Sequence, residues 1–172
     1  MCICMIGKEH FMALNMKIKM ATICDVPVIL QMIRELADYE QLLHEVVASE
    51  KQLADTLFCD NPHAKALLAT IEGEPIGFVI YFYNYSTFHA KYGIYIEDLY
   101  IRPSHRGKGY GKELLQYLCQ IAIKEDCSRL QWWVLDWNKS AIEFYQSLGA
   151  VAMDEWTVFR MTEEKMRKLI GN

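Results

Sequence analysis

The most informative part of this 172-residue sequence is Arg102-Pro103-Ser104-His105-Arg106-Gly107-Lys108-Gly109-Tyr110-Gly111-Lys112. The segment contains three glycines, four Lys or Arg residues and no acidic residue, whereas the whole chain has a net charge of −4. Glycine-rich turns let backbone N–H groups approach an anion closely, and the N-terminus of a following helix adds partial positive charge. The segment therefore predicts a site for a phosphate or pyrophosphate.

Two common phosphate-binding motifs do not fit this segment. A Walker loop needs GxxxxGK followed by Ser or Thr, but Arg106 stands where the first glycine belongs and an acidic residue follows the lysine. A dinucleotide fingerprint needs a glycine three residues after its GxG, where this sequence has lysine or leucine. The spacing that fits is Arg-x-x-Gly-x-Gly, formed by Arg106, Gly109 and Gly111.

Apolar periodicity places this segment between a strand and a helix in a mixed α+β chain. Runs of β-branched, aromatic and aliphatic residues predict strands over 17–22, 64–71, 76–83, 92–101, 130–135 and 151–161. Helical spacing and capping residues predict helices over 25–40, 49–61, 112–125 and 140–148, and a last helix after Thr162. Strands with interspersed helices and hairpins predict an α+β domain around one twisted sheet.

Composition excludes several classes of protein. With 52% hydrophobic and 23% charged residues, the chain is a globular protein and not a disordered or fibrous one. The longest apolar run, 76–83, is much shorter than the about 20 residues of a membrane span. The acidic balance argues against nucleic-acid binding, and the scattered histidines argue against a metal site.

The cysteines and the N-terminus lead to further expectations. Four cysteines are expected as core or half-buried residues of a reduced, cytoplasmic protein: Cys24, Cys59, Cys119 and Cys127. Residues 1–15 lack the features of a secretory signal and any clear periodicity. We expect them to be an upstream extension or remnant, followed by a single domain over 16–172.

The Arg106, Gly109 and Gly111 spacing, after a strand and at the start of a helix, resembles the acetyl-CoA motif of the GCN5-related N-acetyltransferases. The resemblance covers about residues 16–172. It implies the GNAT fold, a twisted, mostly antiparallel sheet of about six to seven strands with about four to five helices. It also implies that loop amides hold the pyrophosphate of acetyl-CoA and that the preceding strand pairs with the pantetheine arm. The cofactor-binding residues it implies are Leu99, Tyr100, Ile101, Arg106, Gly107, Lys108, Gly109, Tyr110, Gly111, Lys112, Asn138, Ser140 and Phe144.

Further motifs are similar to the diamine acetyltransferase subgroup, which includes spermidine/spermine and thialysine acetyltransferases. They are Tyr39-Glu40, Ile96-Glu97-Asp98-Leu99, Asp136-Trp137-Asn138, Phe144-Tyr145 and Trp156. This resemblance implies a homodimer that acetylates a primary amine on a small, often polycationic molecule, with no metal. Direct attack in a ternary complex is the implied mechanism.

The resemblance also implies roles for individual side chains. Glu97 is the candidate that takes the proton from the ammonium form of the substrate, and Asp98 is a substrate-binding neighbour. Adjacent strand residues point to opposite faces, so the pair acts together only across a bulge, which the family has at this point. Leu99 offers its backbone N–H to the thioester oxygen. Tyr145 is the candidate general acid, because a phenol pKa near 10 suits protonation of a departing thiolate.

Tyr39, Glu40 and Trp156 are expected to recognise the amine through charge and aromatic faces. Two alternatives stay open at this point. The chain acetylates a protein, a peptide or another amine with the same donor site, or it is a non-catalytic module that binds acetyl-CoA.

Overall fold

The computed structural model describes residues 15–171, and expectations about residues 1–14 lie outside that range. The described chain divides into two compact units, one ending at Trp133 and one beginning at Val134. The expectation of a single domain over 16–172 stays a prediction.

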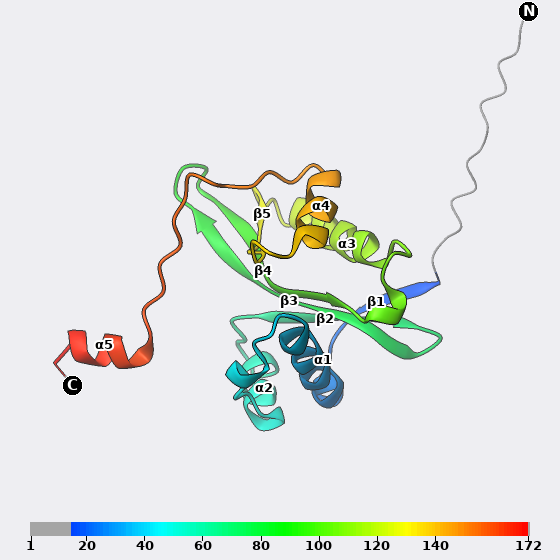
Figure 1. The fold of residues 1–172 in the computed structure, drawn as a ribbon, viewed down its shortest axis with the longest axis horizontal. Coiled ribbons are helices and arrows are strands. Elements are labelled where there is room, and N and C mark those ends of the chain that lie inside the picture. The colour runs from blue at the N-terminus through cyan, green and yellow to red at the C-terminus, as the bar shows by residue number, and fades with distance from the viewer. Residues whose placement is uncertain (1–14, 172) are drawn as a thin grey trace, which may run out of the picture. The chain divides into compact units, whose positions relative to one another are not determined.

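A five-stranded sheet forms the centre of the first unit (Figure 1). The strands follow the chain order across the sheet, and only the last pair, β4 with β5, is parallel. This mixed, mainly antiparallel sheet confirms the expected fold class with slightly fewer strands than predicted. The strands are β1 (Met16–Met20), β2 (Lys65–Ile71), β3 (Glu74–Ser86), β4 (Lys91–Ile101) and β5 (Leu130–Gln131).

Helices cover both faces of this sheet. α1 (Val26–Tyr39) and α2 (Glu50–Leu57) lie against one face, and α3 (Tyr110–Lys124) lies against the other (Figure 1). The helix α2 begins as predicted, with Ser49 and Gln52 forming a capping box. Alternate strand residues point to the two helical layers, so both faces of the sheet are apolar. The core on the α1 side is made by Ile29, Met32, Leu57, Ala66, Leu68, Phe78, Ile80 and Tyr100.

The second unit differs most from the expectation. It contains α4 (Lys139–Ser147) and α5 (Glu163–Leu169), but residues 151–161 form no strand. The predicted strand over 130–135 is reduced to the two residues of β5. Alternating apolar residues indicate a strand only where a neighbouring strand accepts their backbone hydrogen bonds. Residues 151–161 have no such partner among the described residues, and their side chains are exposed.

Two smaller expectations are also corrected. Cys24, Cys59 and Cys119 are exposed, and only Cys127 is half-buried as predicted. Cys24 lies in a short 3-10 helix, Cys59 follows the end of α2, and Cys119 lies on the exposed side of α3, so none of these side chains reaches the core. The sequence marks Asp25 as the N-cap of α1, and Asp25 takes that position. Its carboxylate makes no capping hydrogen bond and instead accepts hydrogen bonds from the Thr22 backbone and from Lys19. No helix in residues 15–171 is long and apolar enough to cross a membrane.

Candidate active site

The glycine-rich segment connects β4 to α3 through a tight turn with two left-handed residues. Gly107 has a φ of 72° and Gly109 a φ of 90°, a region that side chains rarely adopt. Gly109 is the N-cap of α3, so the first N–H groups of the helix, which lack partners within it, face this turn. A Cβ built on Gly107 would meet no atom within 4 Å, so this side of the turn is open. The turn fits an anionic group held by backbone amides.

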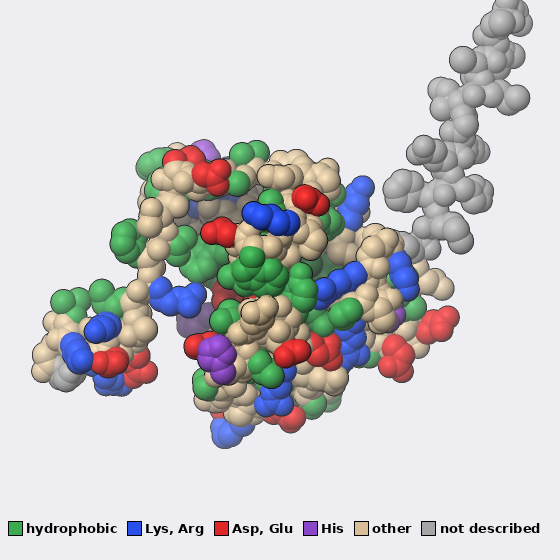
Figure 2. Space-filling view, viewed as in Figure 1, with side chains coloured by type: hydrophobic (Ala, Val, Ile, Leu, Met, Phe, Trp, Pro, Cys, Tyr) green, Lys and Arg blue, Asp and Glu red, His purple; other side chains and the backbone are tan. Residues whose placement is uncertain are grey.

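Some of the basic side chains of the segment are already engaged in contacts within the protein. Basic side chains gather on the side of the first unit where the loop between β4 and α3 lies (Figure 2). However, Arg102 is paired with Glu35 of α1 at 3.2 Å and donates to the Pro75 carbonyl oxygen at 2.9 Å. Lys108 donates to the Ser104 carbonyl oxygen within the loop. Arg102 is therefore committed to holding the fold, and the charges left for an anion belong to the later part of the segment.

Arg106 lies between two aromatic rings. Its guanidinium carbon lies 4.6 Å from the centre of the Tyr39 ring and 5.4 Å from the centre of the Tyr100 ring. Its Nε also donates to the Ile101 carbonyl oxygen at 2.8 Å. The first residue of the predicted acetyl-CoA motif thus contacts a residue predicted to recognise the amine. Both cation–π contacts fall within the about 6 Å at which a ring attracts a cation.

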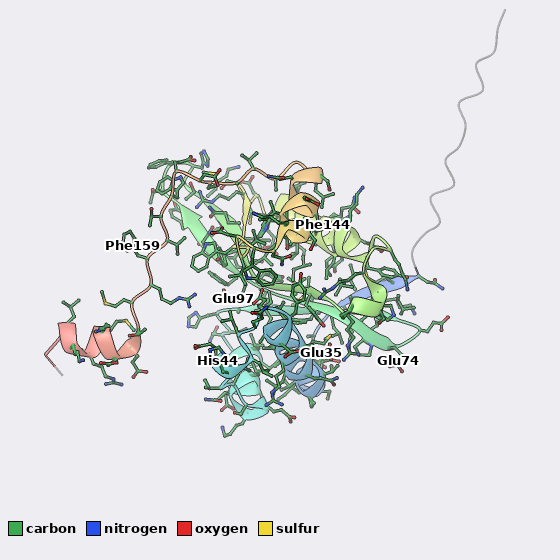
Figure 3. The ribbon with its side chains drawn as sticks, viewed as in Figure 1. Glu35, His44, Glu74, Glu97, Phe144 and Phe159 are labelled. Atoms are coloured by element: carbon green, nitrogen blue, oxygen red, sulfur yellow. The ribbon has the colours of Figure 1, made fainter. Side chains whose placement is uncertain are left out.

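A β-bulge in β4 brings two candidate carboxylates together. The adjacent β3 residues Ile80 and Tyr81 pair with Asp98 and Ile96, so Glu97 is the extra residue between them. Because Ile80 and Tyr81 point to opposite faces, Asp98 and Ile96 do too. Asp98 therefore shares the α1 face with Ile80, and the bulge predicted from the family resemblance is present. Figure 3 labels Glu97 on this strand and Glu35 on α1.

The electrostatics of this region raise the pKa of Asp98 to about 7. Burial is the main cause, and the negative charges of Glu97 and Glu40 add to it. Burial also raises the pKa of Glu40, which follows the last residue of α1. Directly after Glu40, Gln41 has a φ of 61°, a strained conformation that turns the chain away from the helix. Asp98 and Glu40 are partly buried and Glu97 is exposed, so these three acidic side chains form a cluster that is open to solvent at Glu97.

The outer edge of β4 carries the other predicted donor contacts of the first unit. In residues 15–133, β5 pairs with β4 only at Ile94 and Tyr95, so the edge from Glu97 to Ile101 has no strand beside it. The side chains of Tyr100 and Ile101 are buried, and Tyr100 donates to Glu35. Their predicted cofactor contacts therefore involve the backbone only. On the other edge of β4, toward β3, Leu99 is opposite Val79.

The remaining predicted site residues belong to the second unit. Asn138 is the N-cap of α4, where its side-chain oxygen accepts hydrogen bonds from the Ala141 backbone and from Ser140. On the same helix, the rings of Phe144 and Tyr145 lie 5.1 Å apart. Trp156 lies in the irregular segment after this helix and is 68% exposed. The roles predicted for these residues stay predictions.

The first unit thus combines a glycine turn at a helix N-terminus, an open strand edge beside a bulge, and a cluster of three carboxylates. The sequence model of the Acetyltransferase (GNAT) family matches residues 30–150, and the chain belongs to this family. The thialysine N-epsilon-acetyltransferase of Sus scrofa is 40% identical over 83% of this chain and 90% of its own. The L-ornithine N5-acetyltransferase of Arabidopsis thaliana is 32% identical over 89% of this chain and 87% of its own. The chain is therefore an N-acetyltransferase whose relatives are named for small amines.

Solved structures support the same fold. An integron cassette protein from V. cholerae superposes with a TM-score of 0.78 at 27% identity, over 93% of this chain and all of its own. An aminoglycoside acetyltransferase from a soil metagenome gives a TM-score of 0.72 at 20% identity, over 86% of this chain and 96% of its own, which shows the fold alone.

In the part of the chain that the structure describes, no group of three or more His, Cys, Asp or Glu side chains is placed to hold a metal ion.

Sequence reasoning missed the pairing of Glu35 with Arg102 and the stacking of Tyr39 on Arg106. On α1, the two partner residues Glu35 and Tyr39 are four positions apart. In the loop, the two arginines Arg102 and Arg106 are also four positions apart. That repeated spacing was visible in the sequence. Its meaning depends on α1 and the loop being neighbours, which only the fold shows.

Proposed function

We propose that this protein transfers the acetyl group of acetyl-CoA to a primary amine of a small diamine-like molecule, by direct attack in a ternary complex. The observation that carries the proposal is the carboxylate cluster of Glu40, Glu97 and Asp98 in the same unit as the open glycine turn. A polycationic acceptor needs acidic side chains, and an anionic donor needs backbone amides. The names of the relatives, thialysine and L-ornithine acetyltransferases, favour the same substrate class.

The donor side of the proposed site uses backbone groups. The amides after Gly107 and Gly109 hold the pyrophosphate, and Lys112 in the first turn of α3 adds a positive charge. Residues 97–101 of β4 offer their outer edge to an extended ligand arm. Acetyl-CoA supplies the activated acetyl group, and the Leu99 N–H polarises its carbonyl oxygen.

On the acceptor side, the acidic cluster binds the ammonium and accepts its proton. A carboxylate accepts a proton most usefully when its pKa lies near the working pH, and the pKa of Asp98 is about 7. We therefore assign the proton transfer first to Asp98, with Glu97 as the neighbour predicted from sequence. The neutral amine nitrogen then forms the C–N bond as the C–S bond breaks. The nitrogen releases its second proton to solvent as the amide forms, and the departing sulfur takes up a proton.

Tyr145 is the proposed donor of that proton. The change Tyr145→Phe removes the hydroxyl and keeps the ring, so we expect kcat to fall about 10- to 100-fold while the Kd for acetyl-CoA stays the same. Steady-state kinetics from pH 6 to pH 10, together with calorimetric binding of acetyl-CoA, measure both quantities. Tyr85→Phe, which removes a hydroxyl from an exposed tyrosine of β3, is the matched control. Full activity of the Tyr145 variant at every pH contradicts the role.

The proposed function is tested by comparing amines under one set of conditions. The full chain is incubated with acetyl-CoA and, separately, with thialysine, ornithine, spermidine, a lysine-containing peptide and a peptide with a free N-terminus. Products are measured by mass spectrometry, because Cys24, Cys59 and Cys119 are exposed and would react with thiol reagents. We expect kcat/KM for one of the small diamines to exceed that for either peptide at least about tenfold. Preference for a peptide, or acetyl-CoA binding without turnover of any amine, overturns the proposal.

A homodimer and a cytoplasmic location belong to the same proposal. The second unit exposes nonpolar side chains at Val151, Trp156 and Phe159, and a partner subunit would remove such side chains from water. Sedimentation of the purified chain is expected to give twice the mass of 20.1 kDa. Three exposed free cysteines favour a reducing compartment, and localisation of the tagged chain in cells tests that assignment.

A further inference from the structure

Two arginine contacts join the donor loop to the end of helix α1. Arg102 is held by the Glu35 carboxylate through its Nε and Nη2 atoms, each at 3.2 Å. Four residues later, Arg106 stacks on Tyr39, which is itself four residues after Glu35. Residues four apart on a helix lie on the same face, so α1 presents one acidic and one aromatic partner to the two arginines. We call these two contacts, Glu35 with Arg102 and Tyr39 with Arg106, the arginine clamp.

Tyr100 connects the two halves of the arginine clamp. Its hydroxyl donates to Glu35 at 3.2 Å, and its ring lies 5.4 Å from the Arg106 guanidinium. The ring is buried and contacts Phe78 in the core, so the clamp is anchored on a rigid strand. The Arg102–Glu35 pair is also only about a quarter exposed, which limits solvent screening. The clamp is therefore one connected network and not a set of separate surface contacts.

The two ends of this network face different substrates in the proposed function. Arg106 precedes Gly107, where the left-handed turn that fits the pyrophosphate begins. Tyr39 precedes Glu40, a member of the acidic cluster that shapes the pKa of Asp98. Because Arg106 contacts the Tyr39 ring, the position of Arg106 in the loop and the position of Tyr39 at the end of α1 depend on each other.

We infer that Arg106 is a positioning residue, and that the arginine clamp makes binding of acetyl-CoA and binding of the amine mutually cooperative. The inference rests on the proposed function for the identity of the two ligands. The inference gives Arg106 a role in coupling the two ligands, whereas the sequence predicts Arg106 only as a contact of the cofactor. Thermodynamic linkage requires that each ligand raises the affinity for the other by the same factor.

The test measures that factor directly with ligands that do not react. Calorimetry gives the Kd of thialysine without coenzyme A and with saturating coenzyme A, which carries the pyrophosphate but no acetyl group. For the unaltered protein we expect about a tenfold lower Kd when coenzyme A is present. Arg106→Lys keeps the charge and loses the planar stacking group, so the factor is expected to fall to about twofold or less. The KM for the amine is expected to rise correspondingly.

Variants at Tyr39 separate coupling from direct contact. Tyr39→Phe keeps the ring and is expected to keep the factor, whereas Tyr39→Leu removes the ring and is expected to abolish it. Loss of a direct contact with the amine alone would weaken binding equally with and without coenzyme A, leaving the factor unchanged. Arg34→Lys, on an exposed position of α1, is the control for an arginine change on this helix. An unchanged factor in both Arg106→Lys and Tyr39→Leu overturns the inference.

A second readout is independent of the amine. Coenzyme A alone is expected to slow amide hydrogen exchange of residues 36–41 in the unaltered protein and not in the Arg106→Lys variant. If no amine of the test panel binds, the proposed substrate class fails, but this exchange experiment still tests the arginine clamp. Equal protection of 36–41 in both proteins, or none in either, overturns the clamp.

Discussion

The change Asp98→Asn is expected to lower kcat/KM for the amine about 100- to 1,000-fold. The amide is nearly the same size as the carboxylate but accepts no proton and carries no charge for the ammonium. The unaltered enzyme is expected to gain activity as the pH rises through about 7, because Asp98 ionises there. That rise should be absent in the variant, as a pH series of initial rates will show. If Glu97→Gln loses more activity than Asp98→Asn, the proton acceptor is Glu97.

The same change is expected to stabilise the fold at alkaline pH. Asp98 ordinarily has a pKa of 3.8, and burial beside Glu97 and Glu40 raises it to about 7 in the folded chain. Between these pH values the folded state keeps a proton that the unfolded state has lost, so stability falls as the pH rises. Above pH 7 Asp98 is ionised in the folded chain too. From the shift in its pKa, the free energy of unfolding is then lower by up to about 4 kcal/mol than it would be without this shift.

Urea unfolding at pH 4 and pH 8.5 measures this penalty. The free energies of unfolding of the two proteins should be similar at pH 4, and Asp98→Asn should be the more stable at pH 8.5. Asp38→Asn removes an exposed carboxylate from α1 and controls for the change in net charge. A stability difference that does not vary with pH contradicts the assignment of a raised pKa to Asp98.

The second large effect is expected for Gly109→Val, which should weaken acetyl-CoA binding about 100-fold. Gly109 has a φ of 90°, a conformation that a β-branched residue avoids at a cost of about 1–3 kcal/mol. The chain relieves this strain by rotating the turn, and the amides at the start of α3 then point away from the pyrophosphate. Loss of two charge-assisted hydrogen bonds accounts for an effect of this size.

Gly73→Val is the matched control for Gly109→Val. Gly73 has nearly the same φ, 91°, and a Cβ there would meet nothing within 4 Å. It lies in the turn between β2 and β3, so valine should cause a similar loss of stability without changing acetyl-CoA binding. Calorimetric titration with acetyl-CoA and thermal unfolding of both variants make the comparison. Equal Kd values for the two variants contradict the role of the glycine turn.

Most elements of the first unit could be predicted because their signals are local, whereas β5 is much shorter than expected. The capping box at Ser49 and Gln52 marks the start of α2, and turn residues between two apolar runs mark the β2–β3 hairpin. The glycine spacing of the loop likewise predicted the start of α3 within two residues. Each of these signals lies within a few residues of the structure it specifies.

Features that depend on distant contacts could not be predicted in this way. Residues 151–161 have the composition of a strand, but pairing needs a neighbour that composition does not reveal. The raised pKa of Asp98 depends on burial and on Glu40, 58 positions earlier in the chain. The bulge was expected only from the family resemblance, because one inserted residue leaves no distinct pattern in 96–99.

The arginine clamp also limits how this enzyme can be redesigned. Grafting the first helix of a relative with another acceptor preference would replace Glu35 and Tyr39, and the transplanted helix would meet Arg102 and Arg106 without their partners. The helix and the loop should therefore be exchanged as one module, or those four residues kept.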